Sequence, residues 1–112
     1  MKELTDDVLK EKELLEGLGF QITAVQSIED VLDEIEGSFY YIRSYYSIHL
    51  NNEMVGSCNF FHRAGFYGKR NTLVITYILN KNYIPEEKTK QLVLLGYEEE
   101  GDDWLQREKE IE

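Results

Sequence analysis

Hydrophobic residues recur every three to four positions in two segments near the N-terminus, a spacing typical of helices with one buried side. The first of these helices is predicted over residues 4–18, and glycines at its end offer left-handed stop positions. A third helix is indicated by Pro85, which is followed by two glutamates and suits a first-turn position; this helix ends at Gly96. The apolar stripe of the first helix comprises Leu4, Val8, Leu15 and Leu18.

The second helix has a clear start signal. Ser27 precedes its apolar stripe and Asp30 follows three residues later, a variant of the capping box, and Gly37 ends the pattern. The stripe comprises Ile28, Val31, Leu32 and Ile35. The outward positions are acidic, namely Glu29, Asp30, Asp33, Glu34 and Glu36. This row is either an ordinary solvated helix face or half of an acidic docking surface.

Segments rich in β-branched and aromatic residues predict strands in the rest of the chain. The first strand is short and lies within residues 20–26. Residues 38–63 form a hairpin around Asn51-Asn52, since paired asparagines favour a tight turn. A loop over residues 64–71 then leads to a strand over 72–80, which is apolar on both faces and is therefore expected at the centre of the sheet.

The register of this hairpin has two alternatives. A two-residue turn pairs Cys58 with Tyr45 and Met54 with His49, whereas a three-residue connection pairs Cys58 with Tyr46. The sequence leaves both open. The second register gives one apolar face, formed by Ile42, Tyr46, Ile48, Leu50, Met54, Cys58 and Phe60.

The last fifteen residues, 98–112, are acidic and of uncertain structure. Asp102 or Asp103 can cap a short helix, and the residues that follow are good helix formers. Alternatively, Gly101-Asp102 can turn a hairpin whose second strand begins at Trp104. We favour the helix, and in either case we expect Trp104 to anchor this segment on the body of the protein.

The order of the predicted helices and strands places the chain in the α+β class. We expect one domain, residues 1–112, with a small antiparallel sheet of three to five strands packed by two to four helices. A hydrophobic fraction of 42% is too high for a disordered chain. No apolar run approaches the roughly 18 residues of a membrane span, the N-terminus does not resemble a signal peptide, and a single cysteine fits a reducing compartment. We therefore expect a cytoplasmic protein that binds no membrane.

The net charge of −10 is unevenly distributed along the chain. Residues 1–36 carry −8, residues 37–97 carry +4, and residues 98–112 carry −6. This layout suggests separate acidic and basic surfaces. Because phosphate neutralisation requires a concentrated basic surface, it argues against direct binding of nucleic acid.

Residues with nucleophilic or metal-binding potential are few. Cys58 and His62 lie on one strand about 13 Å apart at ordinary strand spacing, too far for activation of the thiol. His49 has no better partner, and the paired cysteine spacing of a zinc site is absent. Nearly all the carboxylates fall on outward helix faces or in residues 98–112. We therefore assign no catalytic, metal-binding or cofactor-binding residue and expect no cofactor.

Aromatic residues concentrate in the middle of the chain and include adjacent pairs. A pair in a strand sends one ring to each face, so one apolar core cannot bury all the rings. Tyr41, Tyr45 and Phe61 with Arg43 are therefore candidates for an exposed patch, a composition typical of protein interfaces. The alternative is that helices on both sides of the sheet bury these rings.

Together these features favour a non-enzymatic domain that binds another protein. The more specific hypothesis is an acidic inhibitor or immunity-like protein, of bacterial or phage type, that docks on a basic partner surface. One alternative is a small enzyme or ligand-binding domain with a pocket between sheet and helices, which would use His49, His62, Arg43 or Arg63. Another is a structural subunit or a homodimer. The candidate partner-binding residues are Glu29, Asp30, Asp33, Glu34, Glu36, Tyr41, Arg43, Tyr45, Phe61 and Trp104.

Overall fold

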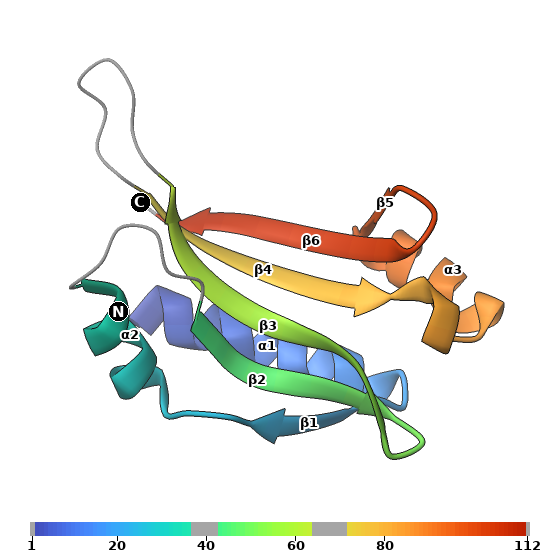
Figure 1. Cartoon of the computed structure of the whole chain (residues 1–112), viewed down its shortest axis with the longest axis horizontal. Coiled ribbons are helices and arrows are strands. Elements are labelled where there is room, and N and C mark those ends of the chain that lie inside the picture. Colours follow the sequence, from blue (N-terminus) through green and yellow to red (C-terminus); the bar gives the residue numbers. More distant parts are fainter. Residues whose placement is uncertain (1, 37–42, 64–71, 112) are drawn as a thin grey trace.

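The computed structural model describes residues 2–36, 43–63 and 72–111. Over these ranges the chain forms a six-stranded antiparallel sheet, ordered β1-β2-β3-β4-β6-β5, with three α-helices (Figure 1). In chain order the elements are α1 (Lys2–Gly17), β1 (Gln21–Ala24), α2 (Ile28–Glu36), β2 (Arg43–Leu50), β3 (Glu53–Arg63), β4 (Thr72–Asn80), the short 3-10 helix η1 (Lys81–Tyr83), α3 (Glu86–Leu95), β5 (Glu98–Glu100) and β6 (Trp104–Ile111). The α+β class is confirmed, and the sheet is larger than predicted.

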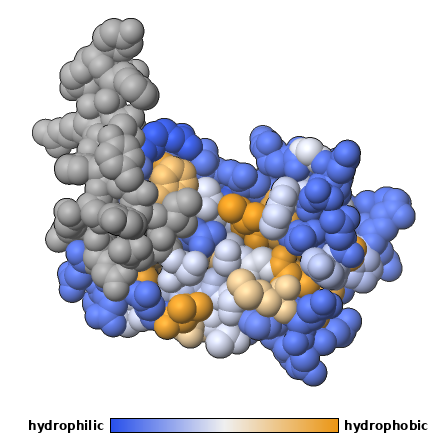
Figure 2. All heavy atoms as spheres, in the orientation of Figure 1, coloured by the Kyte–Doolittle hydropathy of each residue, from blue (hydrophilic) through white to orange (hydrophobic). Residues whose placement is uncertain are grey.

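The hydrophobic core lies between one face of the sheet and the helices. Alternate strand residues point to this face because the side-chain period of a strand is two, and Leu15 of α1, Val31 of α2 and Leu92 of α3 pack against them. The central strands contribute Tyr46, Ile48, Cys58, Phe60, Ile75, Tyr77 and Leu79. Figure 1 shows α1 running behind the sheet. The other side of the sheet, which we call the open face and which faces the viewer in Figure 1 and Figure 2, is not packed by the described helices.

The three predicted helices are present, and the start of α2 and the end of α3 carry the expected signals. The Ser27 hydroxyl accepts a hydrogen bond from the Asp30 amide at 3.1 Å, which caps α2 as the sequence suggested. Pro85 precedes the first turn of α3, and Gly96 ends it in the left-handed conformation with φ 112°. Lys88 in the first turn of α3 donates a hydrogen bond to the Leu18 carbonyl, and this bond joins the start of α3 to the end of α1.

The hairpin β2–β3 uses both predicted registers, one on each side of an irregularity. Near the two-residue turn, His49 pairs with Met54, but further along Tyr46 pairs with Cys58 because the register shifts between Ile48 and His49. One extra residue on β3 accounts for the shift. Met54 is consequently exposed and Val55 is buried in the core, which corrects the predicted apolar face.

Gly56 follows the irregularity and lies tightly against the neighbouring strand. A Cβ atom at this position would lie 2.1 Å from the backbone carbonyl oxygen of Ile78 on β4. Backbone of a paired central strand cannot move away as a flexible side chain can. Glycine is therefore required here by the close approach of β3 and β4.

The acidic C-terminal segment forms a hairpin, which corrects the preference for a helix. β6 pairs with β4 along its whole length and with β5 over three residues. Pairing with β6 satisfies the backbone N–H and C=O groups on the edge of β4 that β3 leaves unpaired, and this long-range pairing overrides local helix propensity. Leu105 is buried and anchors the strand, whereas Trp104 remains 45% exposed on the open face.

Parts of the sequence prediction lie outside the described residues. These are the helix end at Gly37, the first part of the hairpin at 38–42 and the loop at 64–71. Within the described ranges, none of the helices is long and apolar enough to cross a membrane.

Replacing Gly56 with alanine tests the close approach of β3 and β4. We expect Gly56→Ala to lower the free energy of unfolding by about 3 kcal/mol or more, since the added Cβ overlaps backbone. Gly17→Ala is the matched control, because nothing lies within 4 Å of its Cβ position, and we expect little change. Urea unfolding of both variants measures the difference, and equal stabilities would contradict the assignment.

Candidate functional site

The β2–β3 part of the open face carries a ladder of small polar side chains that bond to one another. The Ser44 hydroxyl donates to Asn59 Oδ1 at 2.9 Å, and Asn59 Nδ2 donates to the Ser57 hydroxyl at 3.0 Å. Further along, the Ser47 hydroxyl lies 2.8 Å from His49 Nε2. These groups satisfy each other. Cys58 points into the core on the other face, so the ladder does not combine a histidine with the thiol.

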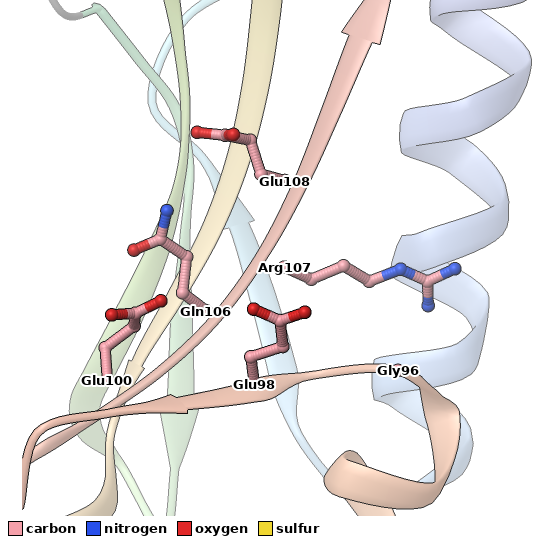
Figure 3. A pocket seen from close by; sticks show the side chains of 6 residues that line it. All are labelled: Gly96, Glu98, Glu100, Gln106, Arg107 and Glu108. Carbon is pink, nitrogen blue, oxygen red and sulfur yellow. The ribbon is translucent and has the colours of Figure 1, made fainter.

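An acidic hollow lies beside the hairpin β5–β6 (Figure 3). Its volume is about 420 Å³, and its lining consists of Gly96, Glu98, Glu100, Gln106, Arg107 and Glu108. Glu98 lies opposite Gln106 in the register of the two strands. Figure 3 shows Gln106 and Glu108 on one side of β6 and Arg107 extending from the other side toward α1. Because successive residues of a strand point to opposite sides, Glu108 and the Arg107 guanidinium lie on different sides of β6.

The carboxylates of the acidic hollow are only partly neutralised. Arg63 on β3 reaches Glu108 at 2.8 Å and also pairs with Glu110. Among the described residues no cation forms an ion pair with Glu98 or Glu100, and both side chains are exposed. The arrangement leaves negative charge on a strand edge, where it attracts cationic groups and disfavours phosphate.

A buried ionic cluster lies beneath this hairpin. Glu11 of α1 is only 5% exposed, and its Oε1 accepts a hydrogen bond from the Tyr97 hydroxyl at 3.0 Å. Arg107 Nη1 lies 3.3 Å from the same oxygen and also donates to the Leu95 carbonyl at 3.0 Å. The cluster therefore joins α1, the end of α3 and β6, and it holds the edge of the sheet that carries the acidic hollow.

Glu11 is an exception to the prediction that the acids lie on outward faces. It falls three residues after Val8 and four before Leu15, so it occupies a position of the apolar stripe of α1. The spacing alone would have identified Glu11 as a buried carboxylate. Its partners could not be identified in this way, since they lie near the other end of the chain.

Burial controls the protonation of the residues that line the core. Removal from water raises the pKa of Tyr46, Tyr77 and Tyr97 above the usual value of 10.0. Burial also raises the pKa of the Cys58 thiol, chiefly through loss of hydration. Cys58 therefore stays protonated at neutral pH and packs as a small apolar side chain, in agreement with the sequence interpretation.

The acidic face predicted on α2 lies apart from the acidic hollow. Glu29, Asp30 and Asp33 are exposed, and α2 packs beside β2 and β3, whereas β5 is the opposite edge strand of the sheet (Figure 1). The side chains of Glu34 and Glu36 lie outside the described residues. The structure thus contains two separate acidic regions.

The predicted aromatic patch is divided between the two sides of the sheet. A second register shift, between Ser44 and Tyr46, accompanies a turn of Tyr45 toward the core, where its ring stacks on Phe60 at 5.6 Å. Phe61 pairs with Val74 on β4, and the Arg63 guanidinium lies 5.9 Å from its ring centre. Tyr41 and the side chain of Arg43 lie outside the described residues.

Charges that are separated in the sequence meet in the folded chain. Lys109 of β6 pairs with Asp7 of α1 at 2.6 Å, and Lys81 of η1 pairs with Glu99 of β5 at 3.2 Å. Arg63 and Lys81 bring cations of the positive middle to acids of residues 98–112, whereas Lys109 and Arg107 join that C-terminal segment to acids of α1. Lys69, Arg70 and the side chain of Arg43 lie outside the described residues, so the separate basic surface stays a prediction.

The other candidate chemistries gain no support within the described ranges. No group of three or more metal-binding side chains gathers there. Comparison of the chain with protein-family models, curated proteins and solved structures finds no match. The geometry and charge of this chain are therefore the only guide to its function.

Removing the Tyr97 hydroxyl tests the buried ionic cluster. We expect Tyr97→Phe to lower the free energy of unfolding by about 1–2 kcal/mol, because Glu11 loses a donor and remains buried. Tyr83→Phe is the matched control, since the Tyr83 side chain is exposed and we expect almost no change. Urea unfolding at neutral pH compares the two. A loss of the same size in both variants would show that the hydroxyl bond contributes nothing specific.

The buried tyrosines also predict instability in alkali. Above pH 10, tyrosines of the unfolded chain release protons, whereas Tyr46, Tyr77 and Tyr97 retain theirs in the fold because their pKa is raised. Their stabilising contribution is complete below pH 10 and falls by about 1.4 kcal/mol per pH unit for each residue above it. Urea unfolding between pH 8 and about 11.5 measures this slope. A flat profile would contradict the burial of the three hydroxyls.

Proposed function

We propose that this protein is a non-enzymatic binding domain that docks the β5–β6 hairpin on a basic surface of a partner protein. An acidic inhibitor or immunity-like protein is the class that this describes. The observation that carries the proposal is the pair of exposed carboxylates, Glu98 and Glu100, which have no cationic partner among the described residues. Lysine and arginine on a partner would supply the missing charge.

Contacts beneath the β5–β6 hairpin hold it in place, which favours binding. Glu11, Tyr97 and Arg107 fix β6 to α1, and Leu105 anchors it in the core. A rigid platform loses little conformational freedom on docking, so more of the interaction energy appears as affinity. Two of the interacting carboxylates come from one short strand, and this fixes their spacing.

The lining of the acidic hollow favours a macromolecular partner over a small substrate. Small-molecule pockets are mostly apolar with a few polar groups, whereas this hollow is lined chiefly by charged and amide side chains. His49 and Arg63, candidates for the enzymatic alternative, do not line it. Negative charge on the rim also opposes a phosphate backbone.

Charge reversal on the hairpin tests the proposal. The immobilised chain is exposed to an extract of the cells that make it, and partners are recovered at low salt and at about 0.5 M salt. We expect a partner that is retained at low salt and released at high salt. Glu98→Lys with Glu100→Lys should weaken its binding about ten-fold or more, since repulsion replaces attraction.

Glu13→Lys with Glu16→Lys is the matched control for this experiment. These residues are exposed on α1, on the other side of the sheet, and their reversal changes the net charge by the same amount. We expect the control to keep the partner. Retention of the same partner by both double variants, or retention unchanged at high salt, would overturn the proposal.

A further inference from the structure

A second hollow on the open face is apolar, and we call it the apolar hollow. Its volume is about 230 Å³, and its apolar lining comprises Met54, Val55, Ile78, Tyr83 and Trp104. Three of these side chains are large and exposed: Met54 at 57%, Tyr83 at 53% and Trp104 at 45%. Met, Tyr and Trp are the residue types enriched at the centres of protein interfaces.

Separate elements hold the walls of the apolar hollow in fixed positions. Met54 faces outward because of the extra residue on β3, and Trp104 pairs with Asn80 at the end of β4. Tyr83 belongs to η1, which is tied to the β5–β6 turn: Asn82 Nδ2 donates to Asp103 Oδ1 at 2.8 Å, and the Lys81 amide donates to the Asp103 carbonyl at 2.8 Å. The fold therefore fixes the backbone positions of the residues that form the walls of the apolar hollow.

The size of the apolar hollow suits a single side chain. It is several times the roughly 30 Å³ that one water occupies, and it is smaller than the roughly 300–1,000 Å³ of typical small-molecule pockets. One aromatic ring or long aliphatic chain from a partner fits this description. Burial of such a group also covers the exposed Met54 and Trp104.

Acidic residues are the neighbours of Met54 and Trp104, two walls of the apolar hollow. Glu53 precedes Met54, Glu100 pairs with Trp104 across β5 and β6, and Asp102 lies in the adjoining turn; all three are exposed. Within the described part of the chain no cation forms an ion pair with them. A partner segment with lysine or arginine beside its apolar residue complements these acidic residues. A second copy of the chain, with net charge −10, does not.

We propose that the apolar hollow receives an aromatic or long aliphatic side chain from a partner segment that carries lysine or arginine next to it. This inference rests on the proposed function and specifies its contact surface. Glu100 lines the acidic hollow and is paired with Trp104, which lines the apolar hollow, so the segment places its apolar residue against Trp104 and directs its cations toward β5. The apolar contact supplies affinity, and the cations supply orientation.

A lysine-flanked peptide provides a defined probe. It contains one phenylalanine between two pairs of lysines, and the reporter is the emission of Trp104, the only tryptophan of the chain. We expect a saturable spectral shift that weakens at high salt and is lost when serine replaces the phenylalanine. A glutamate-flanked version should bind at least about ten-fold more weakly.

Matched variants of the protein assign the peptide to this hollow. Met54→Ser with Tyr83→Ser should weaken binding at least about five-fold, because it removes two apolar walls and keeps the reporter. Leu94→Ser is the control, since Leu94 is exposed on α3 and does not line the apolar hollow. Far-ultraviolet circular dichroism verifies that each variant is folded.

The results of these experiments distinguish a failure of this inference from a failure of the proposed function. It is overturned if the serine peptide gives the same shift, if no saturable shift occurs, or if the Met54 and Tyr83 variant binds as well as the control. A dimer seen by light scattering that becomes a monomer in the Met54 and Tyr83 variant would also overturn it. If the partner captured in the pull-down binds the Met54 and Tyr83 variant unchanged but loses the Glu98 and Glu100 variant, the proposed function stands alone.

Discussion

The buried carboxylate of Glu11 is the constraint on which much of this structure depends. A charged group in a core is tolerated only where donors compensate for lost hydration, and Tyr97 and Arg107 provide them. These residues lie 86 and 96 positions away in the chain. Because one oxygen must meet both, the packing of α1, the end of α3 and the position of β6 are set together.

Local signals explain why the helices were predictable. Ser27, Pro85 and Gly96 act through bonds and dihedral angles within a few residues, so their effect can be seen in a short stretch of sequence. The C-terminal hairpin depends instead on β4, which requires a neighbour on each side. Residues 104–111 carry mostly polar side chains with no strong strand propensity, so local reasoning favoured a helix.

The irregularities of β2 and β3 explain why the candidate site was only partly predictable. One extra residue on β3 moves Met54 to the surface and Val55 to the core, and a second shift accompanies the turn of Tyr45 inward. The rules that relate turn length to strand pairing predict one register, but they do not predict where an extra residue shifts it. Gly56 was the available signal, since glycine inside a strand often marks a bulge or a close backbone approach.

β6 connects the core to the proposed binding surface. Its residue Leu105 joins the core and Arg107 joins the buried ionic cluster. Trp104, Gln106 and Glu108 alternate with these two residues and point to the other side of the strand. The packing of Leu105 and Arg107 therefore also fixes the backbone positions of the outward residues next to them. Trp104 and Glu100 are paired across the hairpin, so an apolar contact and a charge are presented at a fixed separation. In the proposed interaction a partner must match both at once, and this requirement would give the surface a selectivity that negative charge alone does not provide.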